Sequence, residues 1–391
     1  MDERSALGED TVHKLRLNSP VSGWFPALQD LYWSITKSNL PYADLFFSPN
    51  LTKVSIYLSG SWGDSDIPHD ILPTIASVIP AIPASALQLL VIHVDPRRVP
   101  WAVFKEPFSS VVLHCGTSLT ELTSQAPLSD AAISHLIQLP HLHTWFTGGP
   151  PPNFPPPLLP PVFPPLVHLA LWDNAICGWL SLFQRLECDV PPTQGTTSLS
   201  RMKGSLRFLN IRNLYDFVID TSFTSPIRMF HNLISLNVAT RCRDGDVDNR
   251  CAFELNNDNV THLTTALPQL EALFLGHPCF MNTCATTVAC LLSISTNCVK
   301  LRHLEIHFNT TNIVDDLENI FEDPRLQELR SLPRCTISCL KVYQIPLTLD
   351  ESGLETVAHG MIDVFPSLKC FEGFIESWDE LSERLAKFQG V

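Results

Sequence analysis

The sequence predicts an α/β solenoid built from about twelve irregular strand–helix repeats. A short phrase recurs along the 391 residues, with apolar side chains at its first, fourth and sixth positions. Most gaps between successive phrases can hold a helix, and no glycine-rich turn of the kind that binds a nucleotide phosphate follows a phrase. Because each such unit can bury its apolar face only against a neighbour, the units are expected to stack.

Each phrase predicts a β-strand whose apolar residues face the core. Clear examples are Leu166-Val-His-Leu-Ala-Leu and Leu206-Arg-Phe-Leu-Asn-Ile. Polar or small residues replace the third apolar position in three weaker phrases, at Ser124, Thr147 and Gly373. The phrases begin at Leu28, Leu51, Leu87, Leu119, Leu142, Leu166, Leu206, Leu233, Leu270, Leu301, Ile337 and Leu368.

Helices are expected between the strands. Ser129 is a suitable N-cap for a helix that Pro140 ends, and proline often leads into the next phrase, as in Pro268-Gln-Leu270. Similar patterns predict helices over residues 129–139, 256–267, 283–298 and 353–365. An amphipathic pattern at 377–389 predicts one more helix, which would cap the last repeat.

Composition and charge argue against several classes of protein. Apolar residues make up 45% of the chain, so most of it can fold. With 26 basic and 40 acidic residues the net charge is −14, which argues against a nucleic-acid surface. The uncharged stretch 71–94 is interrupted by three prolines, which favours a buried helix and strand over a membrane span.

The expected compartment is intracellular, either cytoplasmic or nuclear. The N-terminus has no apolar export signal, and the 12 cysteines are spread too thinly for a secreted disulfide scaffold. We therefore expect the cysteines to be reduced and mostly buried.

The repeated Leu-x-x-Leu-x-Leu phrase resembles that of leucine-rich repeats, which place parallel strands on a concave face and helices on a convex face. Long irregular periods, the Pro-x-Leu entries, and the segments 25–33 (FPALQDLYW) and 45–58 look like fungal F-box/leucine-rich-repeat-like proteins. The resemblance covers roughly residues 12 to 375 and implies the substrate-receptor part of an F-box-type ubiquitin ligase adaptor. No F-box is visible, because the first 24 residues lack its Leu-Pro start and are too few. A Skp1-type partner is therefore expected only if an F-box lies upstream.

This interpretation divides the chain into three parts. Residues 1–24 form an N-terminal cap or remnant, 25–376 the irregular repeat region, and 377–391 the C-terminal capping helix. The repeat region contains a proline-rich insertion at 148–165, with ten prolines in eighteen residues. We interpret this insertion as a stiff inter-repeat spacer, and the alternative is a ligand for an aromatic groove.

Three sequence patterns bear on catalysis or metal binding. Asp244, Asp246 and Asp248 alternate as in a calcium loop, but the turn glycine and the closing glutamate are missing. A run of His277, Cys279, Cys284, Cys290 and Cys298 lacks the two close pairs that structural zinc needs. Residues 63–66 (GDSD) carry a serine between carboxylates without a nucleophile elbow. We predict no catalytic residues, no metal site and no cofactor.

A stripe of aromatic and basic residues is predicted on the concave face. Side chains alternate along a strand, so the residues next to the apolar positions point outward. Such residue types contribute most of the binding energy at protein interfaces. The predicted partner-binding residues are Tyr32, Tyr57, Trp172, Phe208, Arg212, Phe274, His303, His307 and Tyr343, and Phe146 has the same orientation.

The function expected from these features is non-enzymatic recognition of a protein partner on the concave face, without nucleic acid or membrane. Two alternatives remain open. One is a standalone leucine-rich-repeat interaction protein unrelated to ubiquitin, and the other is an α/β enzyme of unrecognised type.

Overall fold

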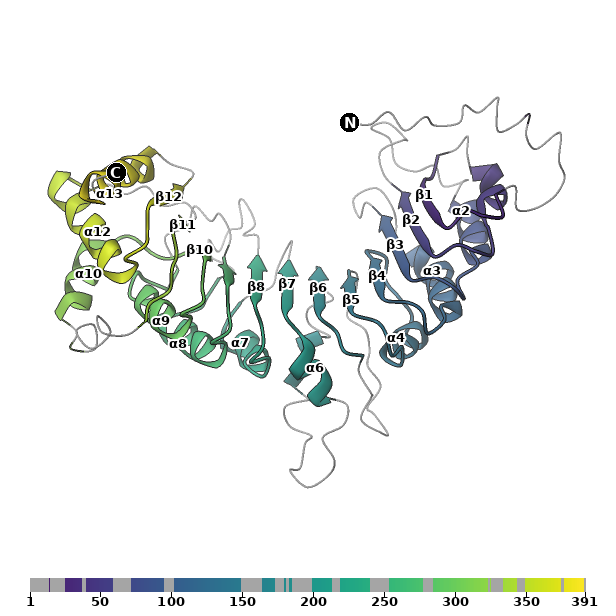
Figure 1. Cartoon of the computed structure of the whole chain (residues 1–391), viewed down its shortest axis with the longest axis horizontal. Coiled ribbons are helices and arrows are strands. Elements are labelled where there is room, and N and C mark those ends of the chain that lie inside the picture. Colours follow the sequence, from purple (N-terminus) through teal and green to yellow (C-terminus); the bar gives the residue numbers. More distant parts are fainter. Residues whose placement is uncertain are drawn as a thin grey trace, which may run out of the picture. The chain divides into compact units, whose positions relative to one another are not determined.

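Strands and helices alternate along the chain in the computed structural model, as the repeated phrase predicts (Figure 1). The structure describes residues 14, 25–36, 40–58, 72–94, 102–148, 164–172, 179–180, 183–184, 199–212, 219–239, 253–276, 284–322, 324, 333–342, 349–373 and 376–389. All twelve phrases are strands.

The strands are β1 (Asp30–Ser34), β2 (Lys53–Leu58), β3 (Leu89–Val94), β4 (Glu121–Ser124), β5 (Thr144–Thr147), β6 (His168–Trp172), β7 (Phe208–Arg212), β8 (Ser235–Ala239), β9 (Ala272–Leu275), β10 (His303–Ile306), β11 (Cys339–Val342) and β12 (Cys370–Gly373). The helices are η1 (Leu40–Phe46), α2 (Leu72–Val78), η2 (Ile79–Ala81), α3 (Ala102–His114), α4 (Asp130–Ile137), α6 (Leu199–Ser205), α7 (Thr221–Ile227), α8 (Asn257–Ala266), α9 (Cys290–Asn297), α10 (Ile313–Glu322), α12 (Glu351–Val364) and α13 (Glu376–Gln389).

The strands follow one another in the sheet in chain order, from β1 to β12, and the pairings are parallel. Within β1–β5 and within β7–β12 each phrase aligns with the next without a shift, so that Val54 of β2 pairs with Leu90 of β3 and Leu340 of β11 with Phe371 of β12. Parallel strands in chain order, joined by helical crossovers, make the chain an α/β leucine-rich-repeat solenoid by fold class.

The chain divides into two compact units. Unit 1 comprises residues 1–168 with 196–202, and unit 2 comprises residues 169–195 with 203–391. In unit 1, helices α2, α3 and α4 lie along one side of the strands (Figure 1). In unit 2, helices α7, α8 and α9 lie along one side of β8–β10 (Figure 1). In each unit the other side of the strands is called the open face below.

The core of each unit lies between the strands and the helices. Apolar phrase residues such as Leu51, Val54 and Ile56 are fully buried. The weaker phrases keep the same orientation, because Ser124 and Thr147 are buried as well. The Ser124 hydroxyl donates a hydrogen bond of 2.9 Å to the Ala126 carbonyl, which satisfies its polar group inside the core.

Most predicted helices are present, and their caps explain where they begin. Ser129 accepts a hydrogen bond from the Ala132 amide at the start of α4. Asn256 and Asn259 form a reciprocal capping box at the start of α8. The stretch 71–94 forms α2, η2 and β3, which confirms the prediction of a helix followed by a strand.

Helix α9 is shorter than the predicted 283–298, since it begins only at Cys290. Two threonines ahead of it bind the preceding repeat instead. The Thr286 hydroxyl donates to the Leu255 carbonyl, and the Thr287 amide donates to Asn257 Oδ1 at 2.8 Å. These long-range bonds hold residues 286 and 287 against the preceding repeat, and the helix therefore starts later.

Helix α13 lies against the last strand, β12. Ser382 Oγ accepts a hydrogen bond of 2.9 Å from the Phe371 amide and donates one of 3.1 Å to the Phe371 carbonyl. Leu381 and Leu385 of the same helix are fully buried. One serine thus satisfies backbone groups on the outer edge of β12, which would otherwise be open to pairing with another strand.

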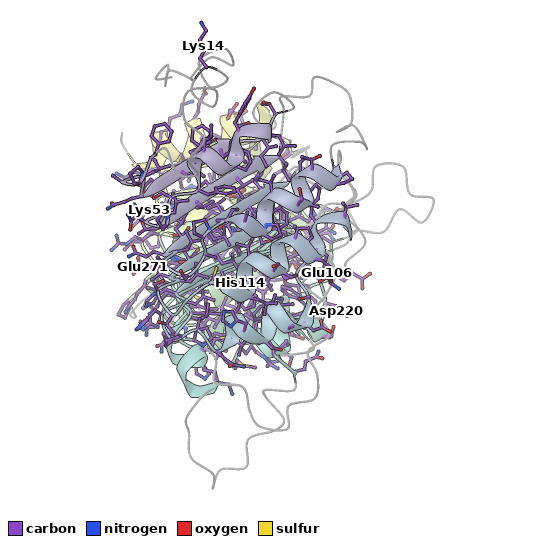
Figure 2. The ribbon with its side chains drawn as sticks, turned by 90° about the vertical axis from the view of Figure 1, so that its right-hand side faces the viewer. Lys14, Lys53, Glu106, His114, Asp220 and Glu271 are labelled. Carbon is purple, nitrogen blue, oxygen red and sulfur yellow. The ribbon has the colours of Figure 1, made fainter. Side chains whose placement is uncertain are left out.

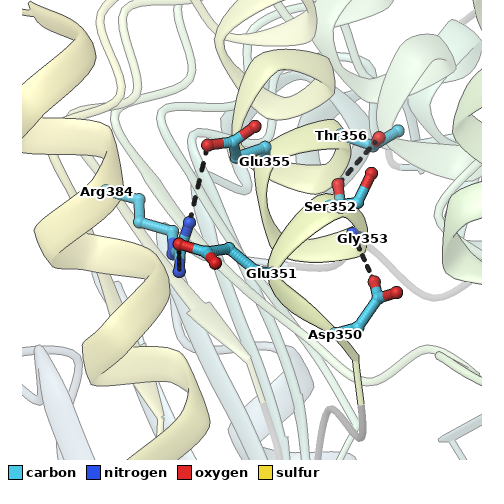
Figure 3. A network of polar contacts seen from close by, with 7 residues as sticks. All are labelled: Asp350, Glu351, Ser352, Gly353, Glu355, Thr356 and Arg384. Atoms are coloured by element: carbon cyan, nitrogen blue, oxygen red, sulfur yellow. Dashed lines mark hydrogen bonds and ion pairs between the residues drawn. The ribbon is translucent and has the colours of Figure 1, made fainter.

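An ion-pair network joins α13 to α12 (Figure 3). The Arg384 guanidinium lies 3.5 Å from Glu351 and 3.8 Å from Glu355. Asp350 caps the start of α12 by accepting a hydrogen bond of 2.8 Å from the Gly353 amide. The two ion pairs link the terminal helix to the helix that precedes it.

Within the described part of the chain, no helix combines the length and the apolar character that a membrane crossing requires.

Candidate functional site: the open face of the sheet

The open face of unit 1 carries an aromatic ladder, made by Tyr32, Tyr57 and His93 on three successive strands. Tyr57 is in register with His93 and stands diagonally opposite Tyr32. The ring centroids of Tyr32 and Tyr57 are 4.6 Å apart, and those of Tyr57 and His93 are 5.5 Å apart. These separations are those of rings in favourable contact across neighbouring strands.

The ladder is open to solvent at Tyr32, whose exposed fraction is 65%, whereas Tyr57 and His93 are half-buried. The pKa of the Tyr57 phenol is raised, first by burial and then by its interaction and hydrogen bond with Tyr32. Tyr57 therefore stays protonated and acts as a neutral hydrogen-bonding group. A broad aromatic surface with phenol groups suits binding of a partner more than acid–base chemistry.

Charged side chains border the ladder. Lys53 Nζ lies 3.4 Å from Asp30 Oδ2, and both side chains are well exposed. Figure 2 shows that Lys53 of β2 lies on one side of unit 1 and Glu106 of α3 on the other. The charged border around Lys53 is therefore on the open face and not on the helix side. An apolar and aromatic centre with a polar border is the usual composition of a protein interface.

The open face of unit 2 holds most of the other predicted residues. Phe208, with an exposed fraction of 36%, and Arg212 are exposed on β7. Trp172 on β6 and Phe274 on β9 are half-buried, and His303 on β10 is exposed. Their orientation agrees with the alternation along each strand, and their role in binding a partner stays a prediction.

The prediction that the His307 side chain points outward is wrong. Its side chain is fully buried, with its ring centroid 6.4 Å from that of Phe253 in an edge-to-face arrangement. Strand β10 ends at Ile306, so His307 no longer follows the alternation. The neighbouring Gly276 has no side chain and a positive φ of 117°, and a Cβ there would lie 2.6 Å from the His307 Cβ. The histidine fills the space that a larger residue at position 276 would need.

Strands β10–β12 also bring polar residues together in two rows of the open face. His303, Cys339 and Cys370 are in register in one row, and Glu305, Lys341 and Glu372 in the next. Lys341 Nζ lies 3.1 Å from Glu305 Oε1, and this pairing compensates a carboxylate that is largely buried.

The sequence interpretation missed several of these open-face residues. His93 occupies the position of Tyr57 in the next phrase, directly after the third apolar residue. Cys339 and Cys370 stand two places after the first apolar position, as His303 does. The register of the phrases alone identifies all three, since each phrase aligns with the next without a shift. The choice of aromatic and basic residue types excluded the two cysteines, whereas His93 fits those types and was overlooked.

Some predicted positions lie outside the described residues. These are Tyr343, the acidic residues Asp244, Asp246 and Asp248, His277 and Cys279, residues 63–66, and 149–163 of the proline-rich segment. Phe146 is half-buried on the open face of β5.

The described cysteines divide into two groups. Cys115, Cys284, Cys290, Cys298 and Cys335 are buried, and burial raises the pKa of Cys115, Cys298 and Cys335 to about 12. Cys339 and Cys370 are free and half-buried. Across the described ranges, no three His, Cys, Asp or Glu side chains are placed to hold one metal ion.

Neither a protein-family model nor a curated protein sequence matches the chain. Among solved structures 63 chains match, and one is the crystal structure of the Rad7 and Elc1 complex in yeast. That match has a TM-score of 0.35 and 16% sequence identity, and it covers 88% of this chain and 82% of the other. A likeness of this size carries no conclusion about function. The class of protein therefore rests on the strand order and register described above.

Proposed function

We propose that this chain is a non-enzymatic scaffold that binds a protein partner on the open face of its sheet. The observation that carries the proposal is the aromatic ladder of Tyr32, Tyr57 and His93 in unit 1, where Tyr32 is 65% exposed. Exposed aromatic rings in contact with one another are costly in water and contribute strongly when a partner covers them. The surrounding Lys53 and Asp30 supply the polar border of such an interface.

The partner-binding set in this proposal comprises the open-face residues without His307. Binding energy at interfaces concentrates in a few aromatic and arginine side chains. Tyr32 and Tyr57 are the anchors proposed in unit 1, and Phe208, Arg212 and Phe274 those in unit 2. His303 and Trp172 are proposed as supporting contacts.

The finer proposal, from the resemblance of the repeats, is the substrate-receptor part of an F-box-type ubiquitin ligase adaptor. Its direct test is binding of a purified Skp1-type adaptor to the longest transcript that encodes this chain. Binding supports the ligase role. If the chain does not bind Skp1 but still captures a partner, it is a standalone repeat scaffold.

The general proposal is tested by affinity purification from the native cells, with the double variant Tyr32→Ser, Tyr57→Ser beside the wild type. We expect the variant to lose at least about tenfold of the captured partner, as removal of two anchors costs roughly 2 kcal/mol or more. Its fold should persist, because Tyr32 is largely exposed and Tyr57 is only half-buried, and circular dichroism checks this.

The matched control is Leu113→Ser, which removes an exposed apolar residue from α3 on the helix side of the same unit. This control should capture the partner as the wild type does. Equal loss in both variants would show that binding does not use the open face, and the proposal would be wrong.

A further inference from the structure

Two half-buried cysteines stand side by side on the last two strands of unit 2. Cys339 opens β11 and Cys370 opens β12, and the two residues are direct partners in the parallel register. In-register residues of neighbouring strands point to the same face, so both thiols lie on the open face. The other five described cysteines are buried.

The spacing of the strands suits a covalent bond between these thiols. Neighbouring strands lie about 4.8 Å apart, and disulfides join residues whose Cα atoms are roughly 4.4–6.8 Å apart. Both side chains are half-buried on the same face of the sheet. No large movement of the backbone is needed to join them.

The surroundings distinguish the two thiols. The pKa of Cys339 is raised, first by burial and then by its interactions with Cys370 and with the Glu372 carboxylate. The Cys370 thiol donates a hydrogen bond of 3.7 Å to the Ser338 carbonyl. Cys339 therefore holds its proton more tightly than an ordinary cysteine, and we expect Cys370 to react first.

We propose that Cys339 and Cys370 are a modification site, a thiol pair that closes reversibly into a disulfide by exchange with glutathione disulfide. Cys370 loses its proton to water, and its sulfur attacks one sulfur of glutathione disulfide, so that one glutathione thiolate leaves. The released glutathione thiolate accepts the proton of Cys339, whose sulfur attacks the Cys370 sulfur, and the second glutathione leaves as a thiolate that takes its proton from water. The protein loses two electrons and two protons, and glutathione disulfide becomes two glutathione molecules.

Closure would join the last two repeats covalently, next to the helix that packs on β12. It would also remove two thiol donors beside His303 and Lys341 on the open face. The proposal rests on strand register and on the shared face of the two half-buried thiols, and it does not depend on the identity of a protein partner.

The test treats the reduced full chain with glutathione disulfide and maps its peptides by mass spectrometry without reduction. In the wild type we expect Cys339 and Cys370 to lose their thiols, to gain one bond between them, and to recover both thiols with dithiothreitol. In the variant Cys339→Ser, Cys370 should keep glutathione as a stable mixed disulfide. In the variant Cys370→Ser, Cys339 should stay reduced.

The matched control is Cys335→Ser, which removes a buried thiol just ahead of β11 and should leave formation of the bond unchanged. Circular dichroism on each variant checks that the fold persists. The proposal is overturned if Cys339 and Cys370 both stay reduced in the wild type, or if they pair with other cysteines. Stable glutathione on Cys339 in the Cys370→Ser variant would overturn the assigned order of attack.

Discussion

His303 and His307 lie four residues apart in the chain and yet have opposite surroundings. The first is exposed on the open face of β10, and the second is fully buried against Phe253. Alternation along a strand predicts the first correctly and fails for the second, because the strand ends between them at Ile306. The deciding feature is Gly276 on the neighbouring repeat, which leaves room for a histidine side chain inside the core.

The two histidines give a matched pair of substitutions. His307→Ala should lower stability by about 2–4 kcal/mol, since it leaves a cavity beside Phe253. His303→Ala should change stability by less than about 0.5 kcal/mol, because its side chain is exposed. Thermal unfolding followed by circular dichroism checks both values. Equal effects would show that His307 is not a core residue.

The backbone conformation of Gly276 requires glycine at this position. Gly276→Ala should lower stability by about 2–4 kcal/mol, because alanine at positive φ is strained and its Cβ would press on His307. Gly204→Ala is the control, since a Cβ there has no atom within 4 Å and alanine suits the helix α6. The control should be neutral or stabilising by up to about 1 kcal/mol. A neutral result for Gly276→Ala in the same unfolding experiment would contradict this account.

The strands are the elements that the sequence predicts best. Their signal is local, because three apolar positions in six residues specify both the strand and the face that it buries. Helices with a side-chain cap, such as α4 and α8, are also predicted well. Helix α9 is not, since the threonines ahead of it bind residues about thirty positions earlier in the chain, and such long-range bonds leave no periodic signal.

The contact between α13 and β12 makes a prediction about the last element. Ser382→Ala removes both hydrogen bonds to Phe371 and leaves a strand amide without its partner, so stability should fall by about 1–3 kcal/mol. The exposed neighbour Glu383 is the control, and Glu383→Ala should be nearly neutral. Amide exchange at Phe371 measures the effect locally, and unchanged protection in Ser382→Ala would show that the helix does not hold the strand edge.

For the whole molecule, the sequence predicts the repeat class and the direction in which most open-face side chains point. Neither composition nor spacing predicts which of these side chains touch one another. The contact of Tyr32, Tyr57 and His93 depends on the register of three strands and on side-chain rotamers, which no local sequence pattern specifies. The proposed division at residues 24 and 376 stays a proposal.

The net charge of −14 bears on how the whole molecule meets a partner. An acidic scaffold attracts a basic protein over a range set by the Debye length, so salt should slow their association. We expect the association rate with the captured partner to fall at least about threefold between 50 mM and 300 mM salt, measured by surface plasmon resonance. A rate that is independent of salt would show that charge does not guide the encounter.

The central claim is that the open face binds a protein partner, and hydroxyl-radical footprinting of the full chain with and without the captured partner tests it most directly. We expect Tyr32, Tyr57 and His93 to become protected from oxidation in the complex, while Leu113 on the helix side of unit 1 stays as reactive as before. Protection of Leu113 with unchanged oxidation of the three ladder residues would contradict the account.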